Sequence, residues 1–275
     1  MIVSKQAARV FWRTLPRQLF KPLYTLYENR IVQILKQRNY LPKHLGVILD
    51  GNRHFARAKN KSLKFGWEMG EKRVEELLKW SAEIGIKYVT VWVFSTDNFK
   101  RAAHEVQDLM SVFMQTATQM LSTGVLQKNS IRIKILGDLS GFSHDLIEKF
   151  RLLEEKTKDG ELLQLNVAIG YGGRDEIVQA VKKLVTHEYQ TEQDIEKLVD
   201  KITHENISSH LYTSGIPDPD FIIRTSGEIR LSGFLLWQAA LSEYYFTDVY
   251  WPEFRRIDFL RAIRNYQERN RRFGA

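Results

Sequence analysis

Short apolar runs alternate with amphipathic segments along most of this chain, and this alternation limits the fold more than any other feature. Apolar runs closed by Gly, Asn or Asp are typical of buried strands, whereas apolar residues spaced three and four apart predict helices. We expect strands at residues 45–49, 88–94, 131–136, 162–169 and 221–223, and helices at residues 68–84, 104–121, 142–156, 175–185, 235–242 and 257–269.

Strand followed by helix, repeated about five times, predicts a parallel sheet that is covered on both faces. The 275 residues are long for one domain, but an open α/β sheet often fills such a length. We therefore expect an α/β fold. It consists of a single domain over residues 41–275, with a central mostly parallel sheet flanked by helices, plus a basic helical N-terminal arm over residues 1–40.

The positive charge of the chain is concentrated in that arm. The net charge is +8, and residues 1–40 contain eight Lys or Arg residues against Glu28 alone. The rest of the chain is nearly neutral, which argues against a nucleic-acid partner because such proteins carry a broad basic face. Arg9, Arg13, Arg17 and Lys21 recur every four residues. They could bind an anionic membrane surface, or they could form a solvated tail.

Several classes of site and location can be excluded or set aside from the sequence. There are no cysteines, so disulfides and thiolate metal sites are excluded. No run of 18 apolar residues and no secretory signal pattern occur, so we expect a cytoplasmic protein, with membrane association through the arm left open. Neither a Gly-x-Gly-x-x-Gly turn after a strand nor a Gly-Lys-Ser/Thr loop is present.

Polar side chains follow the expected strands, where an open parallel sheet binds its ligands. Arginine side chains in such a crevice match phosphate oxygens, and a lone Asp can hold Mg²⁺ while phosphates supply further ligands. Each Arg alone could be a structural residue, but together they predict a site for a phosphorylated, metal-bound substrate. The residues expected to converge are Asp50, Asn52, Arg53, Asn98, Arg101, Arg224, Glu228, Arg230 and Ser232.

Five blocks of the sequence, at residues 44–53, 94–101, 166–174, 223–232 and 234–243, resemble those of the cis-prenyltransferases, the undecaprenyl-diphosphate-synthase-like enzymes. The resemblance covers roughly residues 41–275. It implies a Mg²⁺-assisted prenyltransferase that condenses isopentenyl diphosphate with an allylic diphosphate. Ionisation of the allylic substrate leaves negative charge on the diphosphate, which Mg²⁺ and fixed cationic donors would stabilise.

The resemblance also implies roles for individual residues. Asp50 and Asn98 would be catalytic, Asp50 by holding the metal and Asn98 by helping a proton leave the isopentenyl unit. Glu243 would reach the metal across a homodimer interface, near the C-terminal residues 272–274 of the partner. The substrate-binding residues would be Gly51, Asn52, Arg53, Phe55, Ser95, Phe99, Arg101, Arg224, Arg230, Ser232 and Arg272.

Product length is predicted from a short-chain resemblance. The arm at residues 23–28 and the Ser-Gly-Phe at residues 232–234 resemble the bacterial branch that makes farnesyl-length cis products. Val93 stands at a tunnel position where long-chain members often carry Ala, so we expect a short or medium product. His54, Leu63 and Trp67 depart from the family pattern and put diphosphate contacts in doubt.

Two alternatives remain open at this point. One is a long-chain, undecaprenyl-type synthase, and the other is a non-catalytic, membrane-associated subunit on the same fold. Non-catalytic relatives typically lose the metal Asp and the substrate arginines, which this chain keeps. A trans-type synthase would be all-helical with paired Asp-rich motifs, and this sequence shows neither.

Overall fold

The computed structural model describes residues 21–38, 40–190 and 194–269. The strands are β1 (His44–Ile48), β2 (Tyr88–Ser95), β3 (Ile131–Leu136), β4 (Leu163–Tyr171), β5 (Phe221–Arg224) and β6 (Glu243–Phe246). The α-helices are α2 (Lys21–Arg38), α3 (Asn52–Ala58), α4 (Leu63–Ile84), α5 (Ala103–Thr123), α6 (Val125–Lys128), α7 (His144–Thr157), α8 (Gly173–Tyr189), α9 (Ile195–Asp200), α10 (His204–His210) and α11 (Arg256–Glu268). Three 3-10 helices are η1 (Thr96–Lys100), η2 (Gln238–Leu241) and η3 (Trp251–Glu253).

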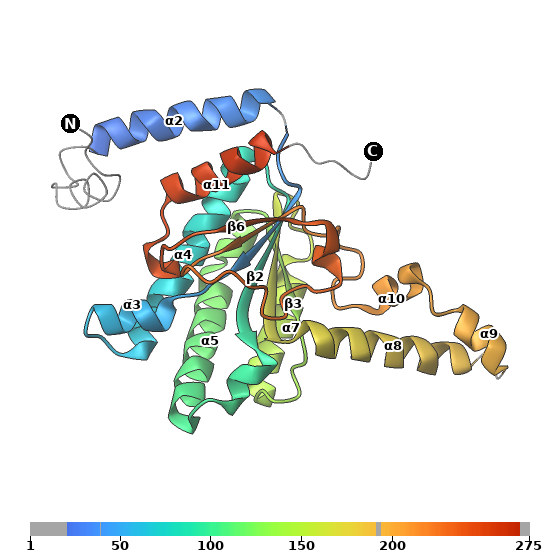
Figure 1. Cartoon of the computed structure of the whole chain (residues 1–275). Coiled ribbons are helices and arrows are strands. Elements are labelled where there is room, and N and C mark those ends of the chain that lie inside the picture. Colours follow the sequence, from blue (N-terminus) through green and yellow to red (C-terminus); the bar gives the residue numbers. More distant parts are fainter. Residues whose placement is uncertain (1–20, 39, 191–193, 270–275) are drawn as a thin grey trace.

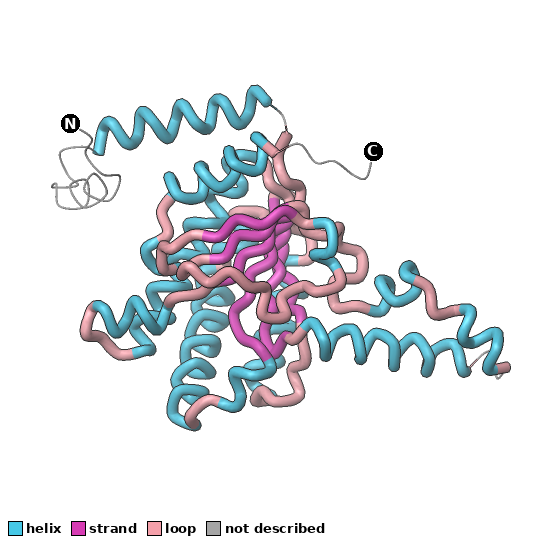
Figure 2. Tube along the Cα trace, in the orientation of Figure 1, coloured by secondary structure: helices cyan, strands magenta, loops and turns pink. Residues whose placement is uncertain are grey.

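The strands form one six-stranded sheet in the order β3-β4-β2-β1-β5-β6, and every pairing is parallel. The expected α/β fold with a central sheet flanked by helices is confirmed (Figure 1, Figure 2). From β1 the chain moves to β2 on one side and later to β5 on the other side, so the direction of winding reverses beside β1. Ligands of open α/β sheets bind at such a reversal, beyond the carboxyl ends of the strands.

Alternating side chains divide the core between the two faces of the sheet. Leu45 and Val47 of β1 face the larger cluster, which includes buried residues of α4, α5, α7 and α11. Ile48 lies in a second cluster on the other face with Ile222 and Phe234. Period-two alternation in a sheet buried on both faces produces the continuous apolar runs that marked these strands in the sequence.

The alternation fails at one place, near the end of β2. Strict alternation would place Trp92 and Phe94 on the same face, but the pairing of β2 with β4 shifts register between them. Trp92 packs against Phe234 on one face, whereas Phe94 packs among Phe99, Phe113 and Phe142 on the other. A bulge adds a residue to one strand of a pair and re-aims the side chains beyond it, so the two rings lie on opposite faces of the sheet.

The segment at residues 235–242 was also expected to be a helix, and this prediction was wrong over most of its length. Only Gln238–Leu241 forms a 3-10 helix, because Leu235 has a positive φ of 47° that an α-helix cannot contain. The chain then enters β6, a short edge strand that the sequence pattern did not predict. The sequence likewise did not predict the short helices α3, α9 and α10.

The arm is helical over Lys21–Arg38, as expected. Its Ile31, Val32 and Leu35 are buried, and α2 lies along α11 (Figure 1). The boundary between the arm and the single domain, placed at residue 40 from the sequence, stays a prediction. The basic positions 9, 13 and 17 lie outside the described residues, so membrane contact through them also stays a prediction. In the described part of the chain, no helix has the length and apolar character needed to span a membrane.

His44 is a buried histidine at the start of β1. Its Nδ1 lies 2.6 Å from the carbonyl oxygen of Pro217, which can only accept, so this nitrogen carries the proton. Its Nε2 then accepts from the Thr90 hydroxyl at 2.7 Å. Burial lowers the pKa of His44 from 6.5 to about 4, so the ring is neutral in the folded protein.

This neutral histidine predicts a loss of stability in mild acid. Between pH 6.5 and 4 the unfolded chain binds a proton at His44 that the folded chain does not. The free energy of unfolding should therefore fall with decreasing pH in that window, by roughly 3 kcal/mol at most from this group. Urea unfolding across the window should show a shallower pH dependence for His44→Gln. The exposed His104→Gln should keep the wild-type slope, and an unchanged slope in His44→Gln would contradict the assignment.

Candidate active site

Three neighbouring strands, β2, β1 and β5, end at one crevice with a volume of about 520 Å³. The sequence predicted that nine polar residues from these strand ends would converge. The structure brings all of them together except Glu228, which does not line the crevice. The crevice is lined by Ile48, Leu49, Asp50, Gly51, Asn52, Arg53, His54, Arg57, Trp67, Trp92, Val93, Phe94, Ser95, Asp97, Asn98, Arg101, Leu109, Arg224, Arg230 and Ser232.

An ion pair between Asp50 and Arg224 lies at the centre of the crevice. The parallel register of β1 and β5 pairs Ile48 with Arg224, and Asp50 follows two residues later. Arg224 Nη2 donates to Asp50 Oδ2 at 2.8 Å, and the Gly51 amide donates to Asp50 Oδ1 at 2.8 Å. The Arg224 side chain is 4% exposed and that of Asp50 34% exposed. The carboxylate is therefore fixed from the protein side but still faces the crevice.

Arg224 also fixes the loop that follows its own strand. Its Nη1 donates to the Arg230 carbonyl oxygen and, at 2.8 Å, to Ser232 Oγ. Within this loop Ser226, Ser232 and Leu235 all have positive φ, a conformation that costs a non-glycine residue free energy. The guanidinium thus holds a strained loop against the Asp50 carboxylate. Strain of this kind is common at binding sites.

Glu105, which the sequence analysis did not select, organises the other cationic side of the crevice. Its carboxylate is buried and lies 3.0 Å from Arg101 Nη1 and 3.6 Å from Arg53 Nε. Burial lowers the pKa of Arg101, with a smaller contribution in the same direction from Arg53, and Glu105 offsets part of the effect. One carboxylate therefore holds two guanidinium groups side by side. The signal for it was its position four residues after Arg101, next to a phosphate-binding candidate.

The loop after β2 presents Ser95 and Asn98 at the crevice. The Ser95 amide donates to Asn98 Oδ1 at 3.1 Å, which orients the Asn98 amide group. The Thr96 hydroxyl donates to Asp175 Oδ2 at 2.9 Å and so connects this loop to α8.

Two aromatic residues expected to bind substrate do not line the crevice. Phe99 packs edge-on against Phe94 and Phe142, with ring centroids 4.8 and 5.2 Å away. Phe55 is buried and stacks on Phe65. Phe99 packs against the larger core cluster, whereas Phe55 packs between α3 and α4, and in both places packing removes ring surface from water.

Asn52 lies between the crevice and a second space. Its Nδ2 donates to the Leu49 carbonyl oxygen at 2.8 Å, and its buried Oδ1 has no hydrogen-bond partner among the described residues. Gly70 of α4 allows this approach, since a Cβ there would lie 2.3 Å from that oxygen.

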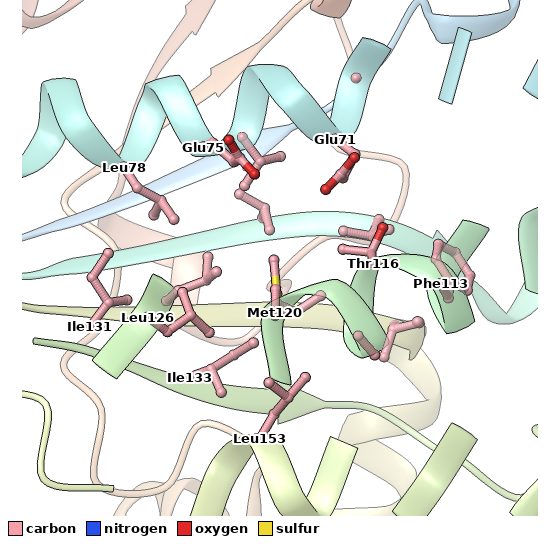
Figure 3. A pocket seen from close by; sticks show the side chains of 18 of the residues that line it. Glu71, Glu75, Leu78, Phe113, Thr116, Met120, Leu126, Ile131, Ile133 and Leu153 are labelled. Carbon is pink, nitrogen blue, oxygen red and sulfur yellow. The ribbon is translucent and has the colours of Figure 1, made fainter. Parts of the chain in front are cut away.

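That second space is an apolar cavity of about 230 Å³ between the sheet, α4 and α5 (Figure 3). Leu49, Asn52, Trp67, Val93 and Leu109 line both the cavity and the crevice, so the two spaces adjoin. The cavity extends along the sheet to Ile131 and Leu162, near the amino ends of β3 and β4. A polar crevice that adjoins an apolar cavity suits a ligand with an anionic head and a hydrocarbon tail.

Glu243 was expected to share a metal with Asp50, but it does not line the crevice of its own chain. It is the first residue of β6 and pairs with Phe221, whereas Asp50 follows the end of β1. In a parallel sheet these positions are at opposite ends, and Glu243 accepts from Arg269 Nη1 at 2.7 Å. Within one chain the two carboxylates do not meet. Arg272 lies outside the described residues.

The donor set at Asp50 fits a metal only when substrate oxygens take part. No group of three or more His, Cys, Asp or Glu side chains with metal-site geometry occurs in the described ranges. Mg²⁺ is commonly held by one or two carboxylates, with water and substrate phosphates as its other ligands. The partly exposed Asp50 carboxylate, with arginines around it, is compatible with that arrangement.

Comparisons with known proteins agree with this geometry. A family model described as putative undecaprenyl diphosphate synthase matches residues 48–274. An isoprenyl transferase of Thermus thermophilus is 52% identical over 256 residues, covering 93% of this chain and 97% of that protein. A (2Z,6E)-farnesyl diphosphate synthase of Mycobacterium tuberculosis is 42% identical over 262 residues, covering 94% and 98%. Among solved structures, a lavandulyl diphosphate synthase from Lavandula x intermedia in complex with dimethylallyl diphosphate has a TM-score of 0.79 and 30% identity, covering 86% and 99%.

Two of the arginines that line the crevice, Arg224 and Arg230, should differ in their effect on stability. Arg224→Ala removes a buried guanidinium and leaves Asp50 and the strained loop without their partner, which should lower the free energy of unfolding by about 1–3 kcal/mol. Arg230→Ala is the matched control, because this side chain is 59% exposed and contacts Glu228 at the surface. Chemical denaturation measures both. Equal stability of the two variants would show that the Arg224 network is not structural.

Proposed function

The chain belongs to the cis-prenyltransferase family, and we propose that it condenses isopentenyl diphosphate with an allylic diphosphate and releases a short or medium cis-prenyl diphosphate. The observation that carries this proposal is the junction of an arginine-lined crevice with an apolar cavity. The crevice would bind the two diphosphates, and the cavity would take the growing hydrocarbon.

The residues of the crevice divide into two sets that suit two diphosphates. Arg53 and Arg101, held together by Glu105, would bind the allylic diphosphate, and their fixed donors would stabilise the negative charge that develops as it leaves. Arg230 and Ser232, positioned by Arg224, would bind the isopentenyl diphosphate. The new carbon–carbon bond forms as the allylic diphosphate departs, and a proton is lost from the isopentenyl unit. We assign the removal of this proton to the loop that carries Asn98.

Asp50 is the residue that we propose holds Mg²⁺ together with substrate phosphate. The bound metal would neutralise charge on the departing diphosphate. In the structure Asp50 Oδ2 accepts from Arg224, so that contact would have to loosen or be shared when the metal binds. The Gly51 amide would keep the other carboxylate oxygen oriented.

Glu243 can join this site only from a second chain. Its position at the opposite end of the sheet from Asp50 is the reason, since no rotation of a side chain spans the length of a strand. We therefore propose a homodimer in which Glu243 and residues 272–274 approach the partner's site. Among the described residues, no strand pairs with the outer side of β6, the edge strand that contains Glu243, so a second chain would have room there.

The sequence left two alternatives open, a non-catalytic subunit and a long-chain synthase, and we favour neither of them over a short-chain or medium-chain enzyme. A non-catalytic subunit would not require the Asp50–Arg224 ion pair or the contacts of Glu105 with its two arginines. Both arrangements are present in this chain. A long-chain synthase remains a second candidate, because the cavity continues well beyond Val93. We favour the shorter product because Val93, a β-branched residue, lines both spaces where crevice and cavity meet.

Replacing the metal carboxylate tests the reaction. Asp50→Ala should lower turnover at saturating Mg²⁺ about a hundredfold or more, the scale of removing one key charge-stabilising group. Asp97→Ala is a suitable control, because Asp97 also lines the crevice but forms an exposed pair with Lys100. Incorporation of labelled isopentenyl diphosphate is the measurement. Near-wild-type turnover of Asp50→Ala would disprove its role.

Changing the entrance of the cavity tests product length. Val93→Ala should lengthen the product and Val93→Leu should shorten it or slow elongation, because overpacking a close-packed wall costs on the order of 1–3 kcal/mol. Chromatography of the dephosphorylated products, with several allylic starters, gives the chain lengths. An undecaprenyl-length wild-type product, or identical distributions for all three proteins, would place the limit elsewhere.

A further inference from the structure

The apolar cavity carries two carboxylates, a feature that neither the diphosphate site nor the packing of the core requires. Glu71 and Glu75 of α4 are half-buried and line the cavity together with residues such as Leu78 and Val74. Figure 3 shows both carboxylates on the side of α4 that carries Leu78, with Thr116 and Met120 of α5 across from them. A hydrocarbon in this cavity would therefore pass charged groups.

The depth of these carboxylates follows from the geometry of the helix. Trp67 of α4 lines the crevice, and the helix then runs back along the sheet towards Ile84. With a rise of 1.5 Å per residue, Glu71 lies about 6 Å and Glu75 about 12 Å beyond Trp67 along the helix axis. On α5, Thr116 lies about 10 Å beyond the crevice residue Leu109 by the same measure. The polar groups of both helices thus fall at a similar depth.

Among the described residues neither carboxylate forms an ion pair, although Lys79 also lines the cavity, one turn of α4 beyond Glu75. Burial raises the pKa of Glu71, the nearby Glu75 raises it further, and Lys72 offsets part of the effect. Because both side chains are half-buried and not fully enclosed, water solvates their exposed part.

A hydrocarbon that fills the cavity would displace this water. Removing water from an unpaired carboxylate costs free energy that offsets what burial of the added isoprene carbons returns. Tail growth past the first turns of α4 should therefore be opposed by the carboxylates even where the cavity has room. This effect differs from a steric stop, because it depends on charge and not on volume.

We propose that Glu71 and Glu75 form an electrostatic limit to product length, and that they set it independently of the wall at Val93. The inference rests on the proposed prenyltransferase activity and adds specificity-determining residues to it. The two carboxylates define the length at which further elongation becomes slower than release of the product.

The test removes the charge and keeps the size. The double variant Glu71→Gln, Glu75→Gln should shift the product distribution towards longer chains by at least one isoprene unit, measured by chromatography of the dephosphorylated products. Glu76→Gln is the matched control, since it removes a carboxylate from the exposed side of the same helix. An unchanged distribution in the double variant, or an equal shift in the control, would overturn the proposal.

A binding measurement separates this inference from the proposed function. Calorimetric titration with unreactive n-alkyl diphosphates of increasing length needs no turnover. For the wild-type protein the affinity should stop rising once the tail reaches the depth of Glu71, whereas in the double variant it should continue to rise, with about tenfold or more between the two proteins for the longer probes. The same length dependence in both proteins would overturn the electrostatic limit, even if the wild-type protein is an active synthase. Thermal unfolding of each variant confirms that it is folded.

Discussion

The ion pair between Asp50 and Arg224 connects the fold of this protein to its chemistry. It exists because β1 and β5 are adjacent and parallel, with Ile48 opposite Arg224, although the two charged residues are 174 positions apart in the chain. The buried guanidinium fixes the carboxylate, and it also holds the strained loop that presents Arg230 and Ser232. A guanidinium suits this position because its planar fork can serve several acceptors at once.

The rest of the site places a cationic, polar crevice directly beside a largely apolar cavity. Arg53 and Arg101 lie together only because the buried Glu105 carboxylate offsets part of their mutual repulsion. Directly beside them the cavity is almost entirely apolar, with Asn52 and Trp67 at the boundary. Trp67 gives the entrance of the cavity an aromatic surface. Recognition of the head and the tail of one ligand is thereby assigned to two adjoining spaces.

Much of the site could be predicted because strand ends are visible in a sequence. Asp50, Asn98 and Arg224 each follow an apolar run, and a parallel sheet gathers such residues at one edge. Glu105 was missed because it lies within a helix, where a carboxylate is usually a solvated surface group. Phe55 and Phe99 stand in site motifs but do not line the crevice, because their sequence neighbours do not show which way a ring points.

The sequence by itself determined the alternation of strands and helices, the parallel sheet and the family, because these depend on local periodicity and on residue identity along the chain. Tertiary structure decided the strand order, the bulge that separates Trp92 from Phe94, and the distance between Asp50 and Glu243. It also decided that the half-buried Glu71 and Glu75 line a largely apolar cavity. These features depend on which distant segments pack together, and that choice is made by the burial of the whole apolar surface, which no short stretch of sequence contains.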